Sequence, residues 1–152
     1  MRQPAIPLAI WFLAACQPGG EVLPNREAFT RLITDQFTRS AEAWNRGDQE
    51  AFLSDYAPDR ETSFVSGGHL RRGFDFIREN YAPRFAPGAP RDSLRFEELD
   101  ARPLSSTLAL VTARFVLFRG SVTTGSGPFT LVMQRRSTGW KILHDHTSSD
   151  PR

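Results

Sequence analysis

Four extended segments follow one another in the C-terminal part of the chain, at residues 94–102, 107–119, 129–136 and 140–148. Connections that contain Gly, Pro or Ser separate them, at residues 103–106, 120–128 and 137–139. Strands joined by turns pair with their neighbours in the chain, because a turn brings the next strand back alongside the previous one. We therefore predict an antiparallel meander as the main sheet of this protein.

The N-terminal part of the domain has helical periodicity. Asn25 can cap a helix that runs to about Asn45. Its apolar residues recur at steps of three and four and form one stripe: Phe29, Leu32, Ile33, Phe37, Ala41 and Trp44. Gly47 can end this helix in a left-handed conformation, and Asp48 can cap a second, shorter helix. The two helices are therefore expected to meet at a corner.

A short hairpin and a third helix come before the meander. Residues 62–65 and 70–73 have the pattern of two short strands around a tight turn. Phe74, Ile77, Tyr81 and Phe85 are spaced for one buried face of a third helix over residues 74–85, and we expect the Pro- and Gly-rich residues 82–90 to end it. Helices followed by a curled antiparallel sheet give an α+β domain, in which the sheet wraps around the helices as a cone.

The strand at residues 107–119 is apolar on both faces. A sheet that exposes one face to water normally alternates apolar and polar residues, so both faces of this strand should be covered. The chain has too little helix to cover both. We therefore predict a homodimer that packs through the outer face of the sheet.

The closing strand combines apolar and polar residues on one face. Regular alternation places Trp140, Ile142, His144, His146 and Ser148 on one side, and Lys141, Leu143, Asp145 and Thr147 on the other. The first face suits a cavity wall with an apolar floor and a polar mouth. The alternative is that neighbouring groups satisfy both histidines and that neither has a chemical role. A His-x-His pair supplies only two metal ligands, so we predict no metal site.

Two motifs resemble those of the nuclear transport factor 2-like superfamily. The pattern W-x-x-x-H-x-H-x-S from Trp140 to Ser148 is similar to the closing strand of its SnoaL-like branch and of the association domain of the calcium/calmodulin-dependent kinase. The run from Gly47-Asp48 to Tyr56-Ala57 resembles the helical corner of the superfamily. The resemblance covers nearly all of the chain after the tether. It implies a cone-shaped nuclear transport factor 2-like fold with an internal pocket, and a dimer formed sheet to sheet.

The first residues have the layout of an export signal. Residues 1–16 contain one early Arg, an apolar stretch and small residues before Cys16, and they resemble a bacterial lipoprotein signal. We predict lipidation at Cys16, a tether at residues 17–25 and the SnoaL-like domain at residues 26–149. Gln17 favours the outer membrane, facing the periplasm, by resemblance to the sorting rule of Gram-negative lipoproteins. An ordinary cleaved signal or a buried apolar start are the alternatives.

We place the cavity between the first helix, the helix from Phe74 and the concave face of the sheet. The residues expected to line it, or to bind a ligand there, are Trp44, Tyr56, Phe64, Tyr81, Arg114, Phe118, Trp140, His144 and His146. Arg114 interrupts an apolar strand, so it needs either a carboxylate partner within the protein or an anionic ligand. Asp55 is a further candidate, which can equally be a solvated residue at a helix end.

Composition limits the functional classes. A formal net charge of +2 over 152 residues, with scattered basic residues, does not indicate nucleic-acid binding. The sequence has no phosphate-binding loop or nucleophile elbow, and we predict no cofactor. In comparison with ketosteroid isomerases, the place of the catalytic base falls near Ser63 or Phe64 and that of the oxyanion-binding tyrosine at Ser40. Those positions lack the isomerase groups.

Three functions therefore stay open. The favoured one is binding of a small molecule in the conical pocket. The second is an isomerase, lyase or hydrolase that uses His144 or His146, because SnoaL-type cyclases and scytalone dehydratase use acid and histidine side chains in their cavities. The third is a dimeric assembly module whose pocket is vestigial.

Overall fold

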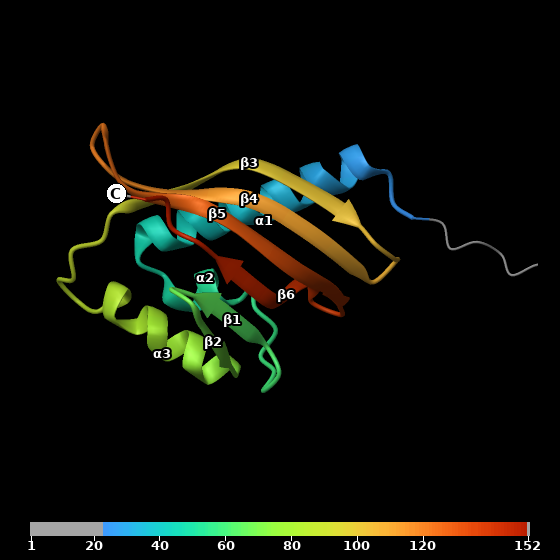
Figure 1. Ribbon diagram of the computed structural model, residues 1–152, viewed down its shortest axis with the longest axis horizontal. Helices are drawn as coiled ribbons and strands as arrows, with labels where there is room; N and C mark the ends of the chain where they lie inside the picture. The colour runs from blue at the N-terminus through green and yellow to red at the C-terminus, as the bar shows by residue number, and fades with distance from the viewer. Residues whose placement is uncertain (1–22, 152) are drawn as a thin grey trace, which may run out of the picture.

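The computed structural model describes residues 23–151 as an α+β fold (Figure 1). The elements in chain order are α1 (Arg26–Arg46), α2 (Gln49–Leu53), β1 (Ser63–Ser66), β2 (His69–Arg72), α3 (Phe74–Phe85), β3 (Ser93–Pro103), β4 (Leu108–Arg119), β5 (Val122–Arg136) and β6 (Gly139–Thr147). The predicted fold class is confirmed. Residues 1–22, which include the predicted signal and Cys16, lie outside the described part of the chain.

The six strands form one sheet in the order β2-β1-β6-β5-β4-β3. Strands β3 to β6 pair with their neighbours as the predicted antiparallel meander. β1 joins the sheet in parallel with β6, so that Ser63 pairs with His144. Figure 1 shows the sheet curving, with α1 along one face and α3 below the β1–β2 hairpin. The space between α1, α3 and the concave face of the sheet is therefore partly enclosed.

Both ends of α1 follow from local sequence. The Asn25 side chain accepts a hydrogen bond of 3.0 Å from the N–H of Ala28, and Gly47 ends the helix with φ of 81°. Buried residues on the inner face of α1 pack against the sheet: Phe29, Ile33, Phe37 and Trp44. Leu32, which the predicted stripe includes, is instead half exposed. The stripe is thus narrower than the periodicity predicts.

α3 ends at Phe85, as its apolar spacing predicts, and Pro83 lies on the exposed side of its last turn, where water can solvate the carbonyl that lacks a donor. One predicted boundary is wrong. β5 begins at Val122, within the stretch predicted as a turn, and its first residues pair with the end of β4. Gly127 belongs to that stretch, and a Cβ atom there would lie 1.9 Å from the carbonyl oxygen of Ser148. The glycine allows the C-terminal tail to cross β5 closely.

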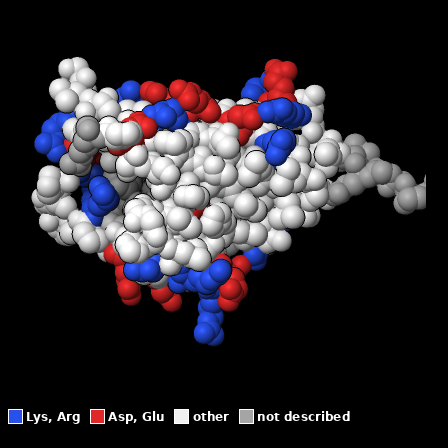
Figure 2. Space-filling view, in the orientation of Figure 1, with Lys and Arg blue, Asp and Glu red and all other residues white. Residues whose placement is uncertain are grey.

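The outer face of the sheet carries few charges at its centre. Figure 2 shows a broad uncharged area over the strands, with charged side chains along its edges. Side chains on the outer phase of β4 and β5 include Leu110, Val116, Phe118 and Val132. Within residues 23–151, no helix is both long and apolar enough to cross a membrane.

Candidate functional site

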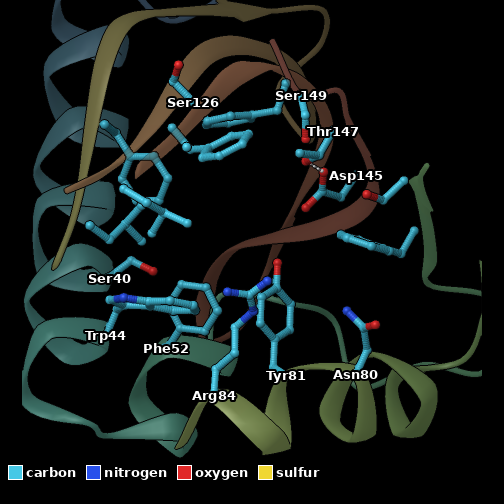
Figure 3. Close-up of a pocket in the computed structure, with 18 of the residues that line it drawn as sticks. Ser40, Trp44, Phe52, Asn80, Tyr81, Arg84, Ser126, Asp145, Thr147 and Ser149 are labelled. Atoms are coloured by element: carbon cyan, nitrogen blue, oxygen red, sulfur yellow. Dashed lines mark hydrogen bonds between the residues drawn. The ribbon is translucent and has the colours of Figure 1, made fainter. Parts of the chain in front are cut away.

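A cavity of about 860 Å³ lies between α1, α3 and the concave face of the sheet. This volume falls within the range of about 300–1,000 Å³ that is common for small-molecule sites. Aromatic side chains make up much of the wall, and Figure 3 shows several of them facing one another across the cavity. They include Phe37, Trp44, Phe52, Phe64, Tyr81 and Phe96.

The aromatic wall between α1, α2 and α3 is held by edge-to-face ring contacts. The ring of Trp44 lies 5.2 Å from those of Phe52 and Phe85, and Phe52 lies 5.1 Å from Tyr81. Trp44 also donates its indole N–H to the carbonyl of Asp92 at 2.8 Å. Since that polar atom is already bonded, the Trp44 ring offers the cavity an apolar surface.

Asp145 is the polar centre of the cavity wall. Its side chain comes from β6, and the residue is only 5% exposed. Tyr56 donates its hydroxyl to Oδ2 of Asp145 at 2.6 Å, and Thr147 donates to Oδ1 at 2.7 Å. In Figure 3 the hydroxyl end of Tyr81 also points toward this carboxyl group. The arrangement gathers a carboxyl and three hydroxyl groups from β6, α3 and the segment after α2.

Burial changes the proton affinity of these groups. Desolvation raises the pKa of Asp145, although the hydrogen bonds from Tyr56 and Thr147 act in the opposite direction. Burial likewise raises the pKa of both Tyr56 and Tyr81, and the negative charge of Asp145 raises it further. Both tyrosines therefore keep their protons at neutral pH. They can act as hydrogen-bond donors toward the carboxylate or a ligand.

Asp55 lies at the cavity wall beneath the first helix. Burial raises the pKa of its carboxyl group, and the amide of Gln36 donates to Oδ1 at 2.8 Å. Gln36 donates to the carbonyl of Trp140 at 2.9 Å as well, so it joins α1 to β6. Of the two interpretations of Asp55, the structure therefore favours a partly buried wall residue over a solvated helix end.

The rim of the cavity consists of its exposed lining residues. α3 contributes Asn80 and Arg84, and the β1–β2 hairpin contributes His69 and Arg71. On the opposite side, Asp92 and Asp150 also line the cavity. Figure 2 shows a hollow between α3 and the β4–β5 hairpin with basic side chains beside it.

Both acidic groups near the rim have close partners. Thr124 donates to Asp92 at 2.6 Å, and Arg119 forms an ion pair with it at 2.6 Å. The hydrogen bond from Thr124 and the pairing with Arg119 hold the pKa of Asp92 below its ordinary value. Ser126 donates to Asp150 at 2.6 Å and Arg114 pairs with it, which lowers the pKa of Asp150 in the same way. Both side chains are thus carboxylates at neutral pH.

Four of the nine pocket residues proposed from sequence line this cavity: Trp44, Tyr56, Phe64 and Tyr81. Arg114 instead pairs with Asp150, which is the carboxylate partner that one interpretation required. Phe118 lies 4.9 Å beneath the guanidinium of Arg95, and Trp140 packs in the core 4.9 Å from the ring of Phe29. These three side chains are not part of the cavity wall.

The two histidines are likewise absent from the wall. His144 shares a hydrogen bond of 2.7 Å with the hydroxyl of Ser63 on β1, and His146 is exposed. The predicted strand phase is wrong because a bulge interrupts β6. Val132 pairs with His144 while the next residue, Met133, pairs with Ile142, so Leu143 is the extra residue. Beyond it, Asp145 takes the inward position predicted for its neighbours.

The sequence holds one signal of this phase change. Ile142 and Leu143 are consecutive apolar residues in a strand that otherwise alternates, and a bulge explains such a pair. Four functional candidates went unrecognised as cavity residues: Asn80, Arg84, Asp145 and Thr147. The two on α3 resemble ordinary solvated helix residues in the sequence. No cluster of three or more His, Cys, Asp or Glu that could hold a metal ion occurs among residues 23–151.

Comparison with known proteins agrees with this architecture. Residues 33–151 match the family model of the SnoaL-like domain. The chain belongs to the SnoaL-like domain family. None of the curated proteins matches it.

Solved structures place this SnoaL-like domain among nuclear transport factor 2-like folds. A nuclear transport factor 2-like protein of unknown function from Shewanella oneidensis is 30% identical with a TM-score of 0.69, over 78% of this chain and 98% of that one. A superfamily protein from Salmonella enterica is 19% identical with a TM-score of 0.62, over 84% and 95%. A Xanthomonas campestris protein named after the calcium/calmodulin-dependent protein kinase II association domain is 17% identical with a TM-score of 0.61, over 80% and 88%. The predicted superfamily is confirmed.

Proposed function

We propose that this SnoaL-like domain binds a small molecule with a largely apolar body in the conical cavity. The observation that carries the proposal is a carboxyl group, Asp145, buried among aromatic walls and facing an open space of about 860 Å³. Apolar walls with a few convergent polar groups are the usual composition of a ligand site.

The hydrogen bonds of Asp145 indicate which ligand group it would contact. An ionised carboxylate can accept about four hydrogen bonds, and Tyr56 and Thr147 supply two. Burying a charge is costly unless it is well bonded, so a further donor would stabilise it. We therefore expect the ligand to place a hydroxyl or N–H group against Asp145.

Protein-observed NMR with a panel of small aromatic and alicyclic molecules tests this function. Compounds with a hydroxyl or N–H group should perturb Trp44, Tyr81 and Thr147 in the wild-type chain. The Asp145→Asn variant should bind them more weakly, while the matched His146→Ala variant should bind them as the wild type does. If no compound perturbs the cavity residues, or if both variants bind as the wild type does, the proposal is wrong.

Catalysis by Asp145 is a second candidate, favoured by the raised pKa of a carboxyl group that faces the cavity. A carboxyl with a raised pKa can take up and return a proton closer to neutral pH, as a general acid or base must. This role replaces the one predicted for His144 and His146, which do not line the cavity. Turnover that is lost in Asp145→Asn but kept in His146→Ala would separate catalysis from binding.

The same proposal includes export and anchoring. We expect Cys16 to carry lipid and residues 17–25 to tether the domain to the outer membrane on its periplasmic side. At ~0.8 kcal/mol per buried methylene, two or more acyl chains give stable attachment. Lipid labelling that depends on Cys16 supports this part, and equal labelling of a Cys16→Ser chain would contradict it.

Assembly is the last part of the proposal. The uncharged centre of the outer sheet face supports a homodimer, because large exposed patches without charge usually mark a contact surface (Figure 2). Light scattering on the Cys16→Ser chain should give the mass of a dimer. A dimer that binds no small molecule would instead favour an assembly module with a vestigial pocket.

A further inference from the structure

The acidic and basic side chains that line the cavity differ in whether they have a bonded partner within the protein. Each acidic wall residue has a bonded partner within the protein: Asp55 with Gln36, Asp92 with Arg119, Asp145 with Tyr56 and Asp150 with Arg114. Two of these partners are arginines, each of which forms an ion pair with one of the two carboxylates nearest the rim. The carboxylates therefore leave little demand for a cationic ligand.

Arg84 lines the cavity from the last turn of α3, and no carboxylate of residues 23–151 lies within ion-pair distance of its guanidinium. Its charge does contribute to the lowered pKa of Asp92, after the hydrogen bond from Thr124 and the pairing with Arg119. In Figure 3 its side chain rises from α3 beside Tyr81, with the guanidinium between Tyr81 and the Trp44–Phe52 wall. Neighbouring arginines do have partners: Arg78 lies 3.9 Å from Asp75 and stacks on Phe74.

A further donor lies close to Arg84 at the same rim. Asn80 is one helical turn away on α3, so both side chains share one face of the helix, and Figure 3 shows both directed toward the cavity. Arg71 also lines the cavity, from β2, but its guanidinium lies 5.8 Å from the ring of Phe76, about two helical turns before Arg84. A guanidinium fork beside an amide donor matches the geometry of a planar anion.

We propose that the ligand of the cavity is an organic carboxylic acid, whose carboxylate binds Arg84 at the rim with Asn80 beside it. The proposal rests on the function given above and adds the chemical class of the ligand. The apolar body then lies against the aromatic wall, and its far end reaches toward Asp145.

A carboxylate suits this rim better than a phosphate. Asp92 and Asp150 line the same cavity, and both are ionised. A second negative charge on the ligand adds repulsion from them, while the guanidinium of Arg84 adds only one unpaired positive charge on the α3 side. A planar group with one charge therefore fits better than a tetrahedral dianion.

Binding of matched naphthalene compounds to the full chain tests the ligand class. Naphthalene-2-carboxylate is compared with its uncharged methyl ester and with 2-naphthyl phosphate, with wild type, Arg84→Gln and Arg78→Gln. Arg78→Gln is the control because it removes the same charge from the same helix outside the cavity wall. We expect the wild type to bind the carboxylate at least about tenfold more tightly than the ester.

Arg84→Gln should remove most of that preference and leave ester binding unchanged, while Arg78→Gln should keep it. Equal binding of carboxylate and ester by the wild type, or tighter binding of the phosphate, overturns the carboxylate assignment and leaves the binding function in place. Equal preference in Arg84→Gln and wild type overturns the role of Arg84. Failure of every compound, the ester included, to perturb the cavity counts against the binding function and the carboxylate together.

Discussion

The two faces of β6 contrast sharply although they belong to the same nine residues. The inner face carries Trp140 and Ile142 in the core and then Asp145 and Thr147 in the cavity wall. The outer phase carries His144, bonded to Ser63, and the exposed His146. The residues with the more reactive side chains thus lie away from the cavity, and a carboxyl group lies in it.

This difference comes from one inserted residue. Because side chains alternate along a strand, a shift of one residue exchanges the two faces completely. Leu143 produces that shift halfway along β6, so the half before it follows the predicted phase and the half after it is reversed. Chemical type alone therefore does not identify a cavity residue in a strand that contains a bulge.

Insertion of one alanine between His144 and Asp145 should have the largest effect. The inserted residue would take the inward position opposite Leu131 and turn Asp145 and Thr147 outward, which leaves Tyr56 without its acceptor. We expect a loss of more than about 4 kcal/mol in the free energy of unfolding, or failure to fold. Deletion of Leu143 is the control, because Ile142 and His144 keep Met133 and Val132 as partners and Asp145 still faces the cavity. Urea denaturation measures both variants, and a deletion variant as unstable as the insertion variant would refute the bulge.

Removing the Tyr56 hydroxyl should have the next largest effect. Tyr56→Phe leaves Oδ2 of the buried Asp145 without its donor, and an unsatisfied buried acceptor costs about 1–3 kcal/mol. Tyr81→Phe is the matched control, because Tyr81 is less buried and gives the smaller expected loss. Chemical denaturation of both variants provides the measurement. Equal losses would show that the Tyr56–Asp145 bond has no special weight.

The stability of the inner face should also depend on pH. The pKa of Asp145 is higher in the folded protein than in the unfolded chain, so the folded state binds this proton more tightly. Its contribution to the free energy of unfolding should therefore fall as pH rises from the ordinary Asp pKa through the raised folded value. Above that window it should be constant.

The free energy of unfolding is measured against pH for the wild type and for Asp145→Asn. The difference between the two curves separates the contribution of Asp145 from those of the other carboxylates. The difference should favour the wild type most at low pH and decline as pH rises. A difference that grows in favour of the wild type with rising pH would mean that Asp145 has a lowered pKa instead.

Substitutions on the outer face of β6 should change the free energy of unfolding least. His146→Ala should change the free energy of unfolding by no more than about 0.5 kcal/mol, as exposed substitutions usually do. His144→Ala removes one partly buried hydrogen bond to Ser63 and should cost about 0.5–1.5 kcal/mol. Thermal unfolding of both variants is sufficient. A large loss in His146→Ala would place that histidine in a structural role that its exposure does not suggest.

The sequence predicts the fold well because its signals are local and repeated. The caps at Asn25, Gly47 and Asp48 and the order of helices and strands all agree with the structure. The aromatic residues of the candidate site could be predicted in the same way, since helical periodicity places Trp44 and Tyr81 on inward faces of their helices. The polar residues of the site could not be predicted from the sequence. The face on which Asp145 lies depends on how β6 pairs with β5. Arg84 differs from other exposed arginines only once the ion pairs of its neighbours are known.

The central claim is that the inner face of β6 supplies the polar group of a ligand site. The most direct test compares the Kd values of 2-naphthol and 2-methoxynaphthalene. The two compounds differ in one donor hydroxyl, so the ratio of their Kd values reports the hydrogen bond that the protein accepts. We expect 2-naphthol to bind roughly tenfold more tightly to the wild type and to His146→Ala, as a hydrogen bond to a charged acceptor implies, and to lose most of this advantage in Asp145→Asn. An advantage that persists in Asp145→Asn and disappears in His146→Ala would contradict the account.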